Sequence, residues 1–281
     1  MFRALLKYTY APAFMVGFLG AALYLIGAGA PKWTLPLLLL VAILVSFASE
    51  RVAPYEESWN QDKGDSATNL AHAIVNEASI FLSVLALPLL VHHLPGFSIW
   101  PDHWPLWLQL FVAVMIADFG ITMAHLASHR FELLWRLHAV HHAAPRLYGF
   151  NGLMKHPLHQ AIELAAGVTP LLLMGITTDV AWLLSFTVGV QLLLQHSNVD
   201  MKIGPLIHVW AVAPAHRHHH LASKTRGDVN FALFSTVWDK MLGTFVANRP
   251  SPREGDVGVA GRPDFPRGYL QHIADPFRRI R

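Results

Sequence analysis

Hydrophobic residues gather in long runs over the first two thirds of the chain. Four runs cover residues 12–30, 34–49, 74–92 and 106–124, and a shorter pair covers 160–176 and 179–195. About 20 apolar residues cross the hydrocarbon core of a bilayer as an α-helix. The pattern therefore predicts an all-α fold, a multi-span transmembrane helical bundle. The short pair forms either two thin spans or a hairpin that enters the membrane and returns.

The composition supports this fold class and limits the chemistry. Hydrophobic residues make up 53% of the chain and charged residues 14%, against about 25% charged residues in soluble proteins. The chain has no cysteine, which excludes disulfides, thiolate zinc sites and iron–sulfur clusters. It has 18 histidines, as many as Asp and Glu together. Any metal must therefore be held by nitrogen and oxygen.

The positive charges predict an orientation. If the N-terminus is cytoplasmic, the cytoplasmic segments are 1–11, 50–73, 125–159 and 196–281, and they hold 20 of the 21 Lys and Arg residues. This distribution follows the positive-inside rule for multi-pass membrane proteins. The formal charge of +3 is small and the basic residues do not cluster in one motif, so we expect no nucleic-acid partner.

Three histidine clusters carry the candidate chemistry. The first is a pair with a spacing of four, and the other two share the pattern His-x-x-His-His. Their members are His125 and His129; His138, His141 and His142; and His216, His219 and His220. Positions i, i+3 and i+4 lie on one face of a helix. One ion rarely takes more than about six ligands, so eight imidazoles favour two metal ions in one pocket.

The predicted topology brings the three clusters to the same membrane surface. His125 lies where the fourth span leaves the bilayer, and His216 follows the return of the short pair. We therefore expect a cytoplasmic helical cap that holds a histidine-rich dimetal site. Asp118 lies seven residues before His125 on the same helical face, and a carboxylate inside a span is costly unless it is paired. It either orients a ligand imidazole or bonds to a neighbouring helix.

Read in order, the clusters resemble the fatty acid hydroxylase/sterol desaturase superfamily of membrane-bound, non-haem di-iron enzymes. Further spaced elements carry the same resemblance over roughly residues 105–247. They are Leu134 to His138, Lys155-His156-Pro157, Gln195-His196-Ser197-Asn198, Asn230-Phe231, Trp238-Asp239 and Gly243-Thr244. The resemblance implies N-terminal transmembrane helices and loops over 1–104, a catalytic domain over 105–247 and a C-terminal tail over 248–281.

The resemblance also implies site residues and a reaction. The eight clustered histidines become metal ligands, His196 becomes a ninth, and His156 either ligates or only forms a hydrogen bond near the pocket. Two iron ions would activate O2 and oxidise an unactivated C–H bond of a lipid, such as a fatty acyl chain or a sterol, to an alcohol or an alkene. The chain has no Gly-rich dinucleotide motif and no haem-attachment motif, so a separate redox protein is expected to donate the electrons.

Two other functions fit parts of the pattern. A membrane metal transporter or metal-binding protein without redox catalysis would also need many histidines, but its ligands should lie near the middle of the bilayer. A structural zinc site would need about four ligands per ion in closed coordination. Eight or nine histidines over two ions nearly permit the zinc site, so both functions remain alternatives to the oxygenase.

Overall fold

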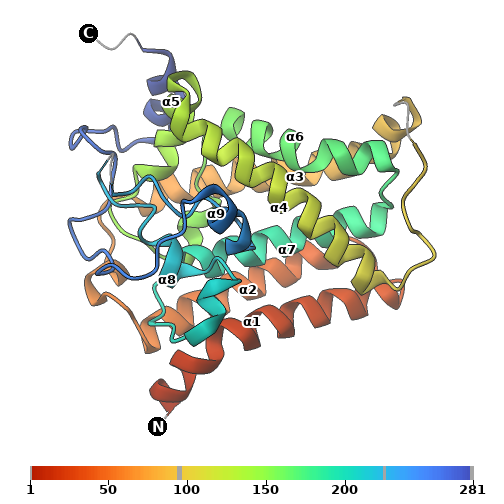
Figure 1. Cartoon of the computed structure of the whole chain (residues 1–281), viewed down its shortest axis with the longest axis horizontal. Helices are drawn as coiled ribbons and strands as arrows, with labels where there is room; N and C mark the ends of the chain where they lie inside the picture. The colour runs from red at the N-terminus through yellow and green to blue at the C-terminus, as the bar shows by residue number, and fades with distance from the viewer. Residues whose placement is uncertain (1, 94–96, 224–225, 279–281) are drawn as a thin grey trace.

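The computed structural model describes residues 2–93, 97–223 and 226–278, and helices dominate these residues (Figure 1). The six long helices are α1 (Phe2–Gly27), α2 (Thr34–Val52), α3 (Ser66–His93), α4 (Leu106–Arg130), α6 (Pro157–Met174) and α7 (Thr178–His196). The shorter elements are η1 (Glu57–Asn60), α5 (Glu132–His142), η2 (Gly149–Leu153), η3 (Gly204–His208), α8 (Ala213–His216), α9 (Thr236–Leu242), α10 (Tyr269–Ala274) and η4 (Asp275–Phe277). The described residues contain no strand, so the predicted all-α class is confirmed.

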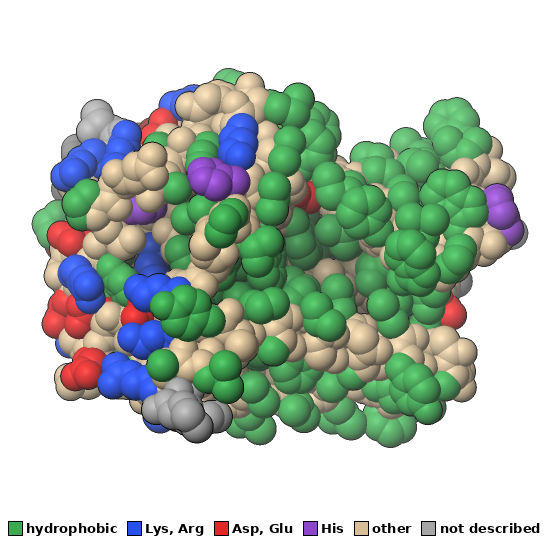
Figure 2. Space-filling view, turned by 60° about the horizontal axis from the view of Figure 1, so that its bottom comes forward, with side chains coloured by type: hydrophobic (Ala, Val, Ile, Leu, Met, Phe, Trp, Pro, Cys, Tyr) green, Lys and Arg blue, Asp and Glu red, His purple; other side chains and the backbone are tan. Residues whose placement is uncertain are grey.

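Most of the long helices run in roughly the same direction, α4 crosses them obliquely, and the shorter elements gather at one end of the bundle (Figure 1). We call this end the head; it comprises residues 53–65, 131–156, 197–223 and 226–278. Both chain termini lie at the head end (Figure 1). Figure 2 shows charged side chains concentrated at one end of the molecule and hydrophobic side chains over the remainder. The surface therefore has the two regions expected of a membrane-embedded helical bundle: an apolar region over the helices and a polar region at one end.

Within the part of the chain that the structure describes, five helices are long and apolar enough to cross a membrane: α1 from Arg3, α2, α3 as far as Ala86, α4 and α7. Two of them begin earlier than the hydrophobic runs predicted. α1 begins at Phe2 rather than near residue 12, and α3 begins at Ser66 rather than near residue 74. The carboxylate of Asp62 accepts hydrogen bonds from the backbone N–H groups of Gly64, Asp65 and Ser66. This turn starts α3 with polar residues in the head, which hydropathy alone does not detect.

The short apolar pair forms two helices, α6 and α7, of which α7 is long and apolar enough to cross a membrane. α7 is the central helix, because 15 of its 19 residues are buried. α2 instead turns large apolar side chains outward; Leu40 is 56% exposed and Leu44 is 67% exposed. Leu37, Val41 and Val45 of the same helix are exposed as well. Soluble monomers rarely expose so large an apolar patch, so this outward face is suited to lipid.

Glycine allows α4 and α6 to pack closely. A Cβ atom added at Gly120 on α4 would lie 2.2 Å from the carbonyl oxygen of Ala166 on α6. A Cβ atom added at Gly167 on α6 would lie 2.9 Å from the side chain of Ile121 on α4. Small residues at such crossings allow backbones to approach in membrane bundles. This contact fixes the position of α4, which carries the first histidine pair.

We expect Gly120→Ala to destabilise the bundle by about 1–3 kcal/mol, because the new methyl group must push the two backbones apart. Thermal unfolding of the purified protein in detergent would measure the effect. Gly20→Ala in α1 is a matched control, since a Cβ atom there meets nothing within 4 Å. Equal unfolding temperatures for the two variants would show that the α4–α6 contact tolerates a larger residue.

Candidate metal centre

Nine histidines from four parts of the chain meet where the bundle joins the head. α4 supplies a pair, α5 a triad, the last residue of α7 one ring, and α8 with the turn after it a second triad. Two groups form, each with its ring nitrogens within 4.8 Å of one another. The first group contains His125, His129, His138, His142 and His219, and the second contains His141, His196, His216 and His220. The structure thus brings together all eight clustered histidines and His196.

Each triad is divided between the two groups. α5 sends His138 and His142 to the first group and His141 to the second. The other triad does not lie on one helix, as the spacing had suggested, because α8 ends at His216. Hydrogen bonds between residues three apart, such as His219 N–H to His216 O at 2.9 Å, continue the chain as tight turns. These turns keep the three rings on the same side of the chain.

The nitrogen separations suit ligands that share an ion. In the first group the Nε2 atom of His125 lies 3.0 Å from Nε2 of His138 and 2.9 Å from Nε2 of His219. In the second group Nε2 of His196 lies 3.1 Å from Nε2 of both His141 and His220. Two nitrogens bound to one metal at about 2.0–2.1 Å lie roughly 3 Å apart when they are adjacent in the coordination sphere.

The backbone fixes which ring nitrogens carry protons. The Nδ1 atoms of His125 and His219 lie 2.8 Å and 2.9 Å from the carbonyl oxygens of Phe231 and Val229. A carbonyl only accepts, so Nδ1 must donate, and a neutral imidazole then has a lone pair at Nε2. The two facing Nε2 atoms therefore both present lone pairs. Such an arrangement is repulsive until a cation binds between them.

The second group has the same arrangement. Nδ1 of His141 donates to the carbonyl oxygen of Met154 at 2.8 Å, and Nδ1 of His196 donates to that of Leu192 at 3.0 Å. Their Nε2 lone pairs again face each other. Hydrogen bonds from the second ring nitrogen to a carbonyl are typical of histidines that bind metals. The donor set therefore fits two cations that accept imidazole nitrogen.

Burial keeps these rings in the form that binds metal. It lowers the pKa of the head histidines well below the ordinary value, and the neighbouring imidazoles lower it further. This holds for His138, His141, His142, His216, His219 and His220. Neutral imidazoles are the ligands that borderline metals prefer.

Asp118 does not contact an imidazole. Its carboxylate accepts hydrogen bonds from the backbone N–H groups of Phe234 and Ser235 and from the indole of Trp238, each at 2.8 Å. The segment held in this way begins at Phe231, whose carbonyl binds His125. Asp118 is therefore linked to that imidazole only through the backbone of this segment. Its bond to Trp238, which lies on α9 (Thr236–Leu242), is a bond to a neighbouring helix, one of the two expected alternatives.

The motif residues near the end of residues 105–247 hold the same segment. Asp239 accepts the backbone N–H groups of Phe231 and Ala232 at 2.7 Å and 3.0 Å. Thr244 donates to Asp239 at 2.7 Å, and Asn230 donates to the carbonyl of Ala215 at 2.7 Å. These residues position the carbonyl groups that orient the histidines.

His156 lies outside both groups. Its Nδ1 atom accepts the backbone N–H of Leu158 at 3.1 Å and caps α6, and its Nε2 atom lies 3.3 Å from the carbonyl of Ile273. Sequence reasoning passed over His159, which is buried with its ring centroid 4.5 Å from that of His138. It also passed over Asp228, which lies 3.3 Å from Nδ1 of His129 and pairs with Arg130. No fixed spacing links these two residues to the clusters.

An apolar cavity leads to the histidines. It has a volume of about 310 Å³ and lies between α3, α4, α6 and α7. Its apolar lining includes Ile80, Val84, Leu164, Val168, Leu172 and Val188. A small inner pocket adjoins it and is lined by His125, His138, His141, His196 and His216. The cavity along α6, from Gln160 to Leu172, extends for about 18 Å at 1.5 Å per residue.

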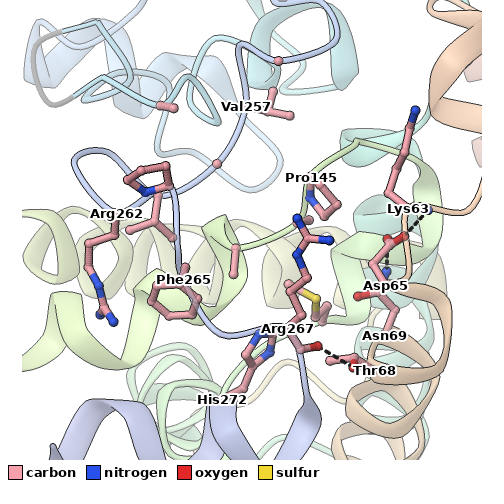
Figure 3. A pocket seen from close by; sticks show the side chains of 18 of the residues that line it. Lys63, Asp65, Thr68, Asn69, Pro145, Val257, Arg262, Phe265, Arg267 and His272 are labelled. Atoms are coloured by element: carbon pink, nitrogen blue, oxygen red, sulfur yellow. Dashed lines mark hydrogen bonds between the residues drawn. The ribbon is translucent and has the colours of Figure 1, made fainter.

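A second cavity, of about 360 Å³, lies within the head (Figure 3). Figure 3 shows Arg267 and His272 of the C-terminal segment facing Thr68 and Asn69 at the start of α3, and Thr68 donates to the carbonyl of Arg267 at 2.7 Å. Met154 lines this cavity and its carbonyl binds His141. The backbone of Met154 therefore lies between this second cavity and His141, whereas the apolar cavity shares lining residues with the inner pocket that the histidines line.

The fold and the site define a class: a helical membrane protein with a cluster of histidines that could hold metal ions, beside an apolar cavity. The family model described as fatty acid hydroxylase matches residues 110–244. An ornithine lipid hydroxylase, OlsE, of Rhizobium tropici is 34% identical over 85% of this chain and 73% of its own length. The chain belongs to the fatty acid hydroxylase family, as its motifs suggested.

More distant relatives include the alkylglycerol monooxygenases of Danio rerio and Homo sapiens. They are 27% and 28% identical over 52% and 53% of this chain, which spans about a third of their length (31% and 32%). No solved structure matches the chain. These relatives are thus named as a lipid hydroxylase and as monooxygenases.

Proposed function

We propose that this protein is a membrane-bound di-iron oxygenase that hydroxylates an unactivated C–H bond of a lipid. The observation that carries the proposal is the pairing of Nε2 lone pairs in both histidine groups, an arrangement that bound cations would stabilise. The first group would hold one iron ion and the second group the other. When bound, the two irons would supply the oxidation of a C–H bond with O2 and external electrons.

The residues of the chain perform the remaining tasks. Backbone carbonyls hold His125, His141, His196 and His219 in one tautomer with Nε2 directed inward. The apolar cavity binds the hydrocarbon part of the substrate and keeps water away from the inner pocket. His156, as the cap of α6, serves the site by positioning rather than by ligation in this proposal.

The orientation and the domain division follow from the same scheme. The positive-inside distribution supports a cytoplasmic head, so the N-terminus and the histidines would lie on the cytoplasmic side. Residues 1–104 would anchor the protein, 105–247 would carry catalysis, and 248–281 would cover the head. A separate cytoplasmic redox protein would dock on the head and donate electrons.

Hydroxylation is favoured over desaturation, because the relatives are named as hydroxylases or monooxygenases. The ornithine lipid hydroxylase aligns with most of the chain, which favours a lipid with a head group over a sterol. Metal transport is disfavoured, because the histidines lie where the bundle meets the head rather than halfway along the long helices.

Mass spectrometry of membrane lipids tests the proposed function. Cells that express the protein are expected to contain a lipid heavier by one oxygen atom, and isotopically labelled O2 should supply that atom. Cells that express a His141→Ala/His219→Ala variant provide the matched control. Identical lipid profiles in the two strains, with both proteins present in the membrane, would refute the proposal.

A further inference from the structure

A buried ion pair lies where the apolar cavity meets the inner pocket. Five residues line both spaces: Ile121, Lys155, Glu163, Leu192 and Leu233. Three of them are apolar, and the other two form a salt bridge of 2.5 Å between Nζ of Lys155 and Oε2 of Glu163. Lys155 precedes α6 and Glu163 lies on it. The wall of the apolar cavity is therefore charged at its inner end, beside the histidines.

The pair retains unused hydrogen-bonding capacity. Lys155 is 8% exposed and Glu163 is 5% exposed, so bulk water does not solvate them. An ammonium has three N–H donors, and within the described residues that of Lys155 bonds only to Glu163. The Oε1 atom of Glu163 lies 3.9 Å from Nδ1 of His159, beyond hydrogen-bond distance. The ammonium of Lys155 can therefore donate further hydrogen bonds, and the carboxylate of Glu163 can accept them, from a ligand where the apolar cavity meets the inner pocket.

The unused donors and acceptors of Lys155 and Glu163 argue against a plain hydrocarbon chain at the inner end of the apolar cavity. An acyl chain placed there would leave the remaining polar atoms without partners, and such burial is unfavourable. A polar group of the substrate at the same position would satisfy them. The pair has no net charge, so a ligand that carries both signs matches it better than a ligand with a net charge of either sign.

We propose that Lys155 and Glu163 recognise a zwitterionic head group of the lipid substrate. An anionic oxygen of the head group bonds to Lys155, and its ammonium bonds to Glu163. The hydrocarbon chain lies in the apolar cavity along α6. The carbon that faces the histidines then belongs to the head group or to the adjoining part of the lipid, not to the far end of an acyl chain. This inference rests on the proposed function and adds the substrate class.

Two matched substrates test the recognition. The first is a zwitterionic amino-acid lipid in detergent micelles, and the second is the same lipid with its amine acetylated. We expect the wild-type protein to prefer the first. Glu163→Gln keeps the shape of the side chain and its bond to Lys155 but removes the charge. It is expected to raise KM for the zwitterionic lipid by about tenfold or more and to leave KM for the acetylated lipid nearly unchanged.

Lys155→Met should instead weaken binding of both lipids, because both keep their anionic oxygen. Lys7→Met is a matched control, since it removes a lysine ion-paired to Asp200 at 2.6 Å, a contact apart from both cavities. It should leave the preference as in the wild type. Iron content is measured for each variant, so that loss of the metal is not mistaken for loss of recognition.

Product analysis of the wild-type protein gives an independent test if a variant fails to fold. Fragmentation of the hydroxylated lipid should place the new oxygen in the head group or on the carbons next to it. Oxygen at the middle or far end of an acyl chain would overturn the inference, as would an unchanged preference in folded, iron-loaded Glu163→Gln. If the wild type oxidises neither lipid nor any other, the proposed function itself fails.

Discussion

Replacing His141 or His219 by alanine is expected to abolish lipid hydroxylation, with a fall of more than about 100-fold. Changes that only disturb the partners of metal ligands already cost about 10–100-fold. The two residues belong to different histidine groups, so each substitution should lower the bound iron by about one ion per chain. Lipid mass spectrometry and elemental analysis of the purified proteins would measure both effects.

His103→Ala provides the control, because the side chain of His103 is 78% exposed and lies in neither group. It should keep both the activity and the iron. Full iron content in the His141→Ala and His219→Ala proteins would contradict the assignment of these rings as ligands, even if activity were lost.

Asp118→Ala is expected to cost about 3 kcal/mol or more of stability, the largest effect that we expect from a residue outside the histidine groups. The change leaves two backbone N–H groups and an indole N–H buried without a charged acceptor, and each unsatisfied donor costs about 1–3 kcal/mol. The released segment carries the carbonyl that orients His125, so iron occupancy should fall as well. Thermal unfolding and iron analysis in detergent would record the two losses.

Asp102→Ala is the corresponding control, since the side chain of Asp102 is 77% exposed. It should leave stability and iron unchanged. If Asp118→Ala lost activity while its stability and iron content stayed at the wild-type level, the carboxylate would have a direct part in catalysis rather than a positioning role.

Local periodicity explains how much of the fold was predictable. Runs of apolar residues specify helices that need a lipid-facing surface, and the structure has these helices. Their polar beginnings were not predictable, because Ser66 starts α3 through a hydrogen-bonded turn at Asp62 in the head. The hydrophobic run begins after these polar residues, so its length does not predict where the helix begins.

The candidate site was predictable in its members but not in its arrangement. Helical spacing placed His138, His141 and His142 on one face of α5. It did not reveal that His141 joins His196 and the other two join His125, because that division depends on how α7 and α4 approach α5. Asp228 and His159 meet His129 and His138 only through long-range packing, which one sequence does not encode at any fixed spacing.

Two iron ions held by imidazoles are the central requirement of the proposed chemistry, and X-ray absorption at the iron edge tests it most directly. The measurement uses the purified, active, full-length protein, with the iron content determined on the same sample. We predict about two irons per chain, each surrounded mainly by imidazole nitrogen. Active protein with no more than trace iron, or with iron that lacks imidazole ligands, would contradict the proposed centre.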